Sequence, residues 1–240
     1  MYIAHRKKAV YLRELPEEKI DLMEDNFFER PMKPMEGMDL DAIYSSIFSM
    51  FREMVPELPE AFLQRYRKGT FPVLFRQDQV IIDYGSISKY AFLMLSGIVR
   101  ISRLLKSRGE TTVMFLSGGD ILMSPKSFYS QILSEEKATA LSDTPCIALS
   151  WQELQGIYRD FPEFNIISRR LTEKYYLQAL ERNTWFYESP EIRYANILEH
   201  YPSLAGLVPV KELASYLGIT RETLSRLRHR TAKKGNNPVK

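Results

Sequence analysis

The chain has 240 residues, 45% of them hydrophobic and 26% charged, with a formal net charge of +3 at pH 7. That length suits one large domain or two ordinary ones. The only cysteine, Cys146, excludes an intramolecular disulfide framework and a cysteine-ligated iron–sulfur or zinc site within one chain. There is no signal-peptide pattern and no run of roughly 18 apolar residues, so we expect a cytoplasmic protein that does not enter the membrane.

Positive charge gathers at the C-terminal end. Residues 190–240 hold nine Lys or Arg and four Asp or Glu, whereas the rest of the chain is slightly acidic. A basic end on a nearly neutral body favours a polyanionic partner for that end alone. A random charge excess on a solvated surface is the alternative.

The N-terminal part predicts an extension followed by helices. Residues 1–38 are charged, rich in Met and interrupted by Pro31 and Pro34, and we interpret them as an extension of undetermined function. Residues 39–55 repeat apolar side chains at helical spacing behind a candidate capping Asp, and a second short helix follows at 58–67.

From Thr70 to about residue 150 the pattern changes to short apolar runs separated by glycine-containing turns. Such runs favour an all-β sandwich, jelly roll or barrel. A short helix is predicted within the series at residues 126–133. Cys146 lies in one of the apolar runs, which is typical of a buried small hydrophobe.

One long helical pattern runs from Pro162 to about Tyr187. It carries more apolar residues than one face against a β-domain requires. The helix is therefore expected either to bury one face in its own domain or to pair with a copy of itself, and periodicity alone leaves both open. Its apolar positions are Ile166, Ile167, Leu171, Tyr175, Tyr176, Leu177 and Leu180.

Three shorter helices follow, at residues 190–202, 208–217 and 220–234. The last two are separated by "GIT" and fit a helix-turn-helix. Ala214 is small where the two helices should touch, and Gly218 gives the backbone freedom to leave the first helix. The apolar wedge between them is formed by Leu213, Leu217, Ile219, Leu224 and Leu227.

The last helix has two chemically different faces. Leu224 and Leu227 fall on one side at 100° per residue, and the opposite side presents Arg221, Glu222, Ser225, Arg226 and His229. Arg bonds bidentately to guanine and Glu accepts from cytosine, so this face is suited to reading bases. A carboxylate among arginines favours base readout over simple phosphate attraction.

The region from about Asp39 to Lys234 resembles the CRP/FNR family of transcriptional regulators. "TRETLSR" matches the family's recognition helix, "YAFLMLSGIVRI" its strand–Gly–strand segment, and "LSGGDIL" the Gly-Asp turn ahead of its ligand pocket. The resemblance implies an α+β fold with a jelly-roll-like β-roll effector domain, a long dimerisation helix and a winged-helix-like helix-turn-helix domain. The expected divisions are 1–38 (extension), 39–160 (β-roll), 161–188 (dimerisation helix) and 189–240 (DNA-binding domain).

The family resemblance also assigns roles and partners. It implies a homodimer on a near-palindromic operator of double-stranded DNA, with RNA polymerase as a further partner. Base contacts are expected from Arg221, Glu222 and Arg226, and phosphate contacts from Thr220, Ser225, Arg228 and Arg230. The tail "TAKKGNNPVK" is short and polar for a β-hairpin wing, so a flexible basic tail is expected to contact the DNA backbone instead.

The sequence departs from the cyclic-nucleotide sensors of the family. Met123 and Ser124 replace their Gly-Glu pair, and Ser134, Glu135 and Glu136 lie where their Arg-Ser/Thr pair binds the cyclic phosphate. Carboxylates repel a phosphate, so we expect no binding of cyclic AMP or cyclic GMP. Two alternatives remain open, namely a pocket for another effector and a filled roll that binds no ligand. The candidate pocket residues are Gly119, Asp120, Ser124, Tyr129 and Thr139.

Other chemistries find little support. Histidine is absent from residues 70–150, which disfavours haem sensing and a cupin-like metal enzyme. We therefore expect no catalytic residues, no metal and no cofactor. The remaining alternative is an adaptor that kept the fold, has no effector and regulates through protein contacts.

Overall fold

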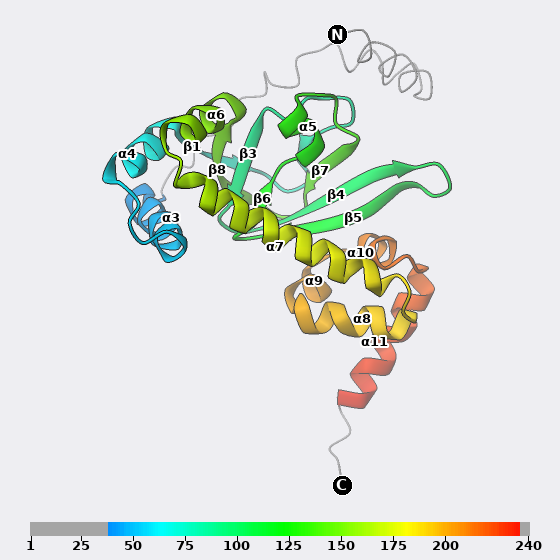
Figure 1. Ribbon diagram of the computed structural model, residues 1–240. Helices are drawn as coiled ribbons and strands as arrows, with labels where there is room; N and C mark the ends of the chain where they lie inside the picture. The colour runs from blue at the N-terminus through cyan, green and yellow to red at the C-terminus, as the bar shows by residue number, and fades with distance from the viewer. Residues whose placement is uncertain (1–37, 236–240) are drawn as a thin grey trace.

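The computed structural model describes residues 38–235, and the chain is α+β (Figure 1). The predicted N-terminal extension lies outside the described residues except for Met38. The described helices are α3 Leu40–Met54, α4 Glu60–Gly69, α5 Pro125–Ser130, α6 Trp151–Asp160, α7 Phe164–Trp185, α8 Pro190–His200, α9 Pro202–Leu207, α10 Val210–Leu217 and α11 Arg221–Gly235. The strands are β1 Thr70–Phe75, β2 Val80–Ile82, β3 Tyr90–Met94, β4 Ile98–Leu105, β5 Gly109–Ser117, β6 Ile121–Leu122, β7 Glu136–Ala140 and β8 Thr144–Ser150.

The strands form two four-stranded antiparallel sheets, in the orders β1-β8-β3-β6 and β2-β7-β4-β5. Their facing sides enclose a core that includes Val73, Met94, Val99 and Leu122. Cys146 of β8 lies in this core and is fully buried, as its apolar context predicts. The interior of the β-roll is therefore filled by side chains rather than held open.

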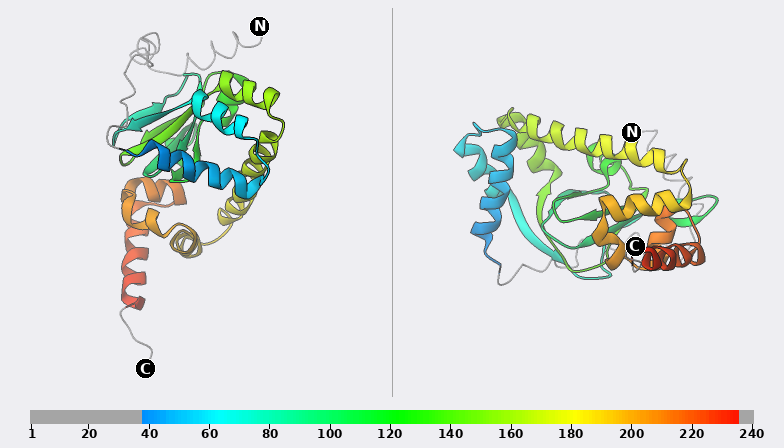
Figure 2. Two further views of the ribbon diagram at one scale, coloured as in Figure 1. Left: turned by 90° about the vertical axis from the view of Figure 1, so that its left-hand side faces the viewer. Right: turned by 90° about the horizontal axis from the view of Figure 1, so that it is seen from below.

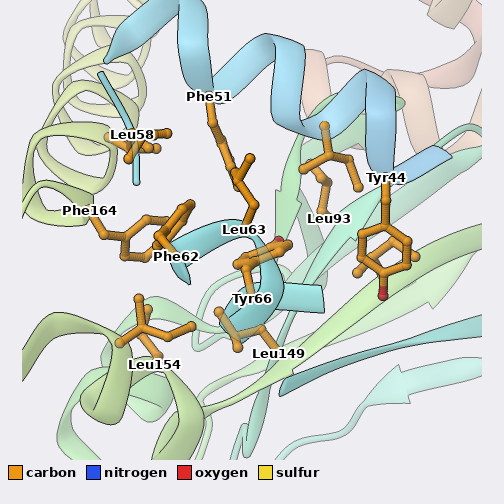
Figure 3. Close-up of a cluster of buried hydrophobic side chains, with 14 of the residues drawn as sticks. Tyr44, Phe51, Leu58, Phe62, Leu63, Tyr66, Leu93, Leu149, Leu154 and Phe164 are labelled. Carbon is orange, nitrogen blue, oxygen red and sulfur yellow. The ribbon is translucent and has the colours of Figure 1, made fainter. Parts of the chain in front are cut away.

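A second core covers the outer face of the β1-β8-β3-β6 sheet. The helices α3, α4, α6 and the start of α7 pack there, with the predicted Asp39 cap accepting a 3.0 Å hydrogen bond from the backbone N–H of Ala42. Figure 3 shows aromatic side chains of three helices pointing toward one another, and the ring centroids of Phe62 and Phe164 are 5.3 Å apart. This aromatic cluster anchors the start of α7 to the roll.

The helix α7 runs along the roll and then on to the C-terminal helices (Figures 1 and 2). At its middle, the hydroxyl of Tyr175 accepts a 2.7 Å hydrogen bond from the backbone N–H of Ile121 and donates to Asp120 at 3.3 Å. Beyond this point Tyr176 and Leu177, each 63% exposed, and Leu180 face solvent, whereas Trp185 at the end of the helix is buried. The start of the helix thus buries Phe164 and Ile167 in its own domain, while Tyr176, Leu177 and Leu180 leave an apolar stripe uncovered. Pairing with a copy of itself stays a prediction.

The helices α8 to α11 surround a third core. This core also takes in Ile98 and Phe115 from the outer face of the β2-β7-β4-β5 sheet, so the helical part rests on the β4–β5 hairpin. The six-residue helix α9 is one that the sequence analysis did not predict. Residues 190–235 contain helices and turns but no strand, so this described part of the chain holds no β-hairpin wing.

Candidate nucleic-acid interface

The two helices α10 and α11 are joined by the turn Gly218–Thr220. Gly218 has φ +66°, the left-handed conformation that a residue with a Cβ rarely adopts. The backbone N–H groups of Gly218 and Ile219 bond back to carbonyls of α10 at 3.1 and 3.0 Å, and Arg193 donates to the carbonyl of Leu217 at 2.6 Å. The predicted glycine is therefore required by the turn itself.

The apolar side of α11 is buried where the sequence predicts it. Leu224 and Leu227 pack into the third core with Leu213, Ala214 and Leu217 of α10, and Ile219 is partly buried against it. Thr220 caps α11, because its hydroxyl accepts a 3.2 Å hydrogen bond from the backbone N–H of Thr223. These contacts fix which side of α11 points outward.

The outward side of α11 brings the predicted base-reading residues together. Arg221, Glu222, Ser225 and Arg226 are all exposed, as is His229. Hydrogen bonds from its own backbone N–H and from the Thr220 hydroxyl lower the pKa of Glu222, and the two neighbouring arginines lower it further. The carboxylate therefore stays ionised and able to accept hydrogen bonds at neutral pH.

Two of the predicted phosphate-contacting residues have partners within the chain. Arg228 is half-buried and donates a 2.8 Å hydrogen bond to the backbone carbonyl of Ala205 in α9. Arg230 lies 3.8 Å from Glu191 at an exposed position. In this conformation Arg228 ties α9 to α11 rather than pointing freely outward, so its predicted phosphate contact would require this bond to break.

An ion-pair cluster connects the β4–β5 hairpin to α10. Arg100 pairs with Glu212 at 2.6 Å and with Glu110 at 2.7 Å. Thr112 donates to Glu212 at 3.0 Å through its hydroxyl and to the Ser215 hydroxyl at 3.0 Å through its backbone N–H. Sequence reasoning missed this cluster because its members lie about 100 residues apart along the chain. We call these five residues the hairpin–α10 cluster.

The predicted effector-pocket residues do not converge on one cavity. Gly119 and Tyr129 line an apolar cavity of about 100 Å³ between the outer face of the β1-β8-β3-β6 sheet and α7. Asp120 faces a different cavity, Ser124 is buried, and Thr139 lines neither of the two. The five residues therefore do not form the single ligand site that the sequence suggested.

The segment where cyclic-nucleotide sensors bind phosphate is closed by internal contacts. The Ser124 hydroxyl donates to the carboxylate of Glu136 at 2.8 Å. Glu135 accepts from Lys126 at 2.7 Å and from Arg103 at 2.6 Å, and these cations lower its pKa. Glu135 is therefore paired with two cations, whereas Glu136 accepts from the Ser124 hydroxyl and lies 4.0 Å from Arg103. The expected repulsion of a phosphate stays a prediction.

Membrane-spanning helices and metal-binding clusters are both absent from residues 38–235. No helix in that range is both long enough and apolar enough to cross a membrane. The same range brings no three His, Cys, Asp or Glu side chains together in a way that could hold a metal ion.

Comparison with known proteins gives consistent matches. Residues 72–161 match the model of the cyclic nucleotide-binding domain family. The chain is 27% identical over 195 residues to the cyclic AMP receptor protein of Thermus thermophilus, covering 78% of this chain and 86% of the relative.

Solved structures share the fold. FixK2 from Bradyrhizobium japonicum matches with a TM-score of 0.60 and 20% identity, over 69% of this chain and 86% of that one. A putative CRP/FNR-family transcriptional regulator from Eubacterium rectale matches with a TM-score of 0.61 and 18% identity, over 79% and 91%.

These matches, together with the β-roll, the long helix and the C-terminal helices, define a cyclic-nucleotide-binding-type β-roll joined by a long helix to a helical region. Residues 72–161 match a cyclic nucleotide-binding domain, and the chain as a whole is similar to a cyclic AMP receptor protein.

Proposed function

We propose that the protein is a sequence-specific DNA-binding transcriptional regulator that acts as a homodimer. The observation that carries the proposal is the outward face of α11, where Arg221, Glu222 and Arg226 are exposed while the leucines of the same helix are buried. Such a face offers bidentate donors for guanine and an acceptor for cytosine in the major groove. The exposed Arg230 and Ser225 are suited to phosphate contacts beside it.

The homodimer contact is assigned to the second half of α7. Its uncovered apolar residues Tyr176, Leu177 and Leu180 are spaced for pairing with the same helix of a second copy. A dimer of this kind would set two α11 helices about one DNA turn, or about 34 Å, apart. A near-palindromic operator follows from that symmetry. Residues 161–188 then serve as the dimerisation element between a roll at 39–160 and a DNA-binding domain at 189–240.

The regulator is proposed not to respond to cyclic AMP or cyclic GMP. Glu136 places a carboxylate on the Ser124 hydroxyl in the segment where sensors of this family hold the cyclic phosphate. An incoming phosphate would meet this carboxylate without a free cation beside it, because Lys126 is paired with Glu135 and Arg103 with both Glu135 and Glu136. Calorimetric titration with either nucleotide is expected to give no heat of specific binding, and micromolar affinity would contradict this part.

The test of DNA recognition is selection of bound duplexes from a random library with the full chain. We expect enrichment of a near-palindrome, with affinity falling steeply as salt rises. Arg221→Ala and Arg226→Ala should each cost about 1–3 kcal/mol and relax preference at one base position. Arg159→Ala, an exposed change on α6, is the matched control and should leave binding unchanged.

Two results would contradict the proposal. Equal weakening on every sequence by Arg221→Ala and Arg226→Ala would show that the arginines contact only phosphates. If no sequence is enriched at low salt, the alternative of an adaptor that regulates through protein contacts is favoured. Such an adaptor would bind its partner, such as RNA polymerase, without DNA.

A further inference from the structure

A cavity of about 380 Å³ lies between the β4–β5 hairpin, the second half of α7 and the C-terminal helices. In Figure 1 these three parts meet where the yellow end of α7 passes the hairpin and α10. The volume is within the range of about 300–1,000 Å³ that small-molecule sites usually have. The cavity is separate from the roll interior, which its own core side chains fill.

Arg182 of α7 is the main charged group of this cavity. It forms no ion pair with any carboxylate of residues 38–235, and its guanidinium lies 3.9 Å from the ring centroid of Tyr216. Burial lowers the pKa of Arg182, because the charged form has lost water without gaining an anion. Stacking on an aromatic ring leaves the edge of the guanidinium fork free to donate hydrogen bonds.

Further arginines add to the positive charge. Arg108 lines the same cavity from the hairpin turn and likewise has no carboxylate partner among the described residues. A Cβ built on Gly218 would lie 3.4 Å from Arg108 and 3.3 Å from Arg193, so both arginines reach the same turn. The Nε atom of Arg193 is buried and lacks a hydrogen-bond partner in the described structure.

The nearby acids do not neutralise this charge. Glu110 and Glu212 are paired with Arg100 in the hairpin–α10 cluster. Asp120, on another part of the wall, lies 3.8 Å from Lys174 and accepts from Tyr175. The cavity therefore has an excess of positive charge at Arg182 and Arg108.

The rest of the wall is largely aromatic and aliphatic. Phe115, Tyr201, Leu204 and Tyr216 contribute apolar surface from both the sheet and the helical part. A ligand that packs against these apolar walls and pairs with the arginines needs a flat apolar body and one anionic group. Arg182 offers one planar fork, which matches the geometry of a carboxylate.

We propose that this cavity is a binding site for a small aromatic carboxylate, with Arg182 holding the carboxylate group and Arg108 assisting it. The site goes beyond the proposed function, because it names a class of effector and places its binding site outside the roll interior, which side chains fill. Elements of both the roll and the helical part contact the ligand, so the ligand stabilises their present arrangement. Binding is measured without DNA, so its failure and that of DNA recognition are separate results.

The experiment is calorimetric titration of the full chain with benzoate and 2-naphthoate. Each acid is paired with its neutral alcohol, benzyl alcohol or 2-naphthalenemethanol, and orthophosphate is tested alone. Arg182→Met keeps the side-chain volume and removes the charge, Arg182→Lys keeps the charge without the fork, and Arg159→Met on α6 is the control. Circular dichroism checks the folding of each variant, and Arg108→Met provides a second test at an exposed position.

We expect at least one acid to bind more tightly than its alcohol and than orthophosphate. Arg182→Met should lower the affinity for that acid by at least about tenfold, since a hydrogen-bonded ion pair is lost. Arg182→Lys should recover part of the affinity, Arg108→Met should reduce it by a smaller factor, and Arg159→Met should leave it unchanged. The proposal is overturned if neither acid binds below about 1 mM, if alcohol and acid bind equally, or if Arg182→Met and Arg108→Met leave the affinity unchanged.

Discussion

Replacing Arg100 by Met should weaken the contact between the β4–β5 hairpin and α10 more than any surface change on the same strand. Arg100 and Glu212 are 12% and 14% exposed, so their 2.6 Å ion pair is largely shielded from water. Removing one partner of a buried pair typically costs about 3–5 kcal/mol, because the other charge is left unpaired. Thr112 still donates to Glu212, and the pair keeps some exposure. We therefore expect a loss of about 2–3 kcal/mol, below the fully buried range.

The measurement is a double-mutant cycle of Arg100→Met and Glu212→Gln. Urea unfolding gives the free energies, and amide hydrogen exchange over α10 reports its local opening. The two changes should be non-additive by about 1–2 kcal/mol, because the double variant leaves neither Arg100 nor Glu212 buried without a partner, and Glu110 is 37% exposed. Arg103→Met on the same strand is the control. Its pair with Glu135 is 39% and 46% exposed, so its loss should cost only about 0–1 kcal/mol.

The reasoning would be refuted by additivity within about 0.5 kcal/mol. It would also be refuted if Arg100→Met left hydrogen exchange over α10 unchanged, since the cluster would then not hold the helix to the hairpin.

Three further predictions concern single sites. Burial opposes ionisation of Glu110, but its hydrogen bond to Arg100 and the charge of Arg100 lower its pKa below the ordinary 4.5 overall. Its contribution to stability is therefore full above pH 4.5 and lost as pH falls through the lowered pKa, and Glu110→Gln should flatten acid unfolding curves there. Gly218→Ala should destabilise the chain by about 1 kcal/mol through strain at positive φ, measured by urea unfolding, and no change would contradict the required turn geometry. Burial raises the pKa of the Cys146 thiol to about 12, so the folded chain should react with a thiol reagent only on unfolding, and rapid reaction of the native chain would refute its burial.

Features set by neighbouring residues were predictable from the sequence. The Asp39 cap, the long helix around Ile167, and the turn at Gly218 with its flanking leucines all depend on spacings of a few residues. Local propensity and apolar periodicity carry this information directly. The exposed face of α11 follows from them, because buried Leu224 and Leu227 fix its orientation.

Features that join distant segments were not predictable in the same way. The pattern around Arg100 is typical of an outward-facing strand residue, and no neighbouring residue in the sequence predicts its ion pair with Glu212. The family resemblance implies a phosphate contact for Arg228, yet its partner in the structure is a backbone carbonyl of α9, a helix that the sequence does not predict. Its six residues are too few to show a clear period. The predicted effector-pocket residues lie in different surroundings for the same reason. Which of them come together depends on how the roll and α7 pack, and local sequence does not show that.

The hydrogen bonds of Tyr175 make the middle of α7 a pivot. Ten residues separate Tyr175 from the end of the helix at Trp185, a length of about 15 Å at 1.5 Å per residue. A tilt of about 10° at this pivot would move the far end by about 3 Å at that rise per residue, roughly the length of one hydrogen bond. Asp120 and Ile121 hold Tyr175, and they lie at the end of the turn before β6 and at the first residue of that strand. A small displacement of that turn would therefore tilt α7 and produce a larger displacement of α8 to α11.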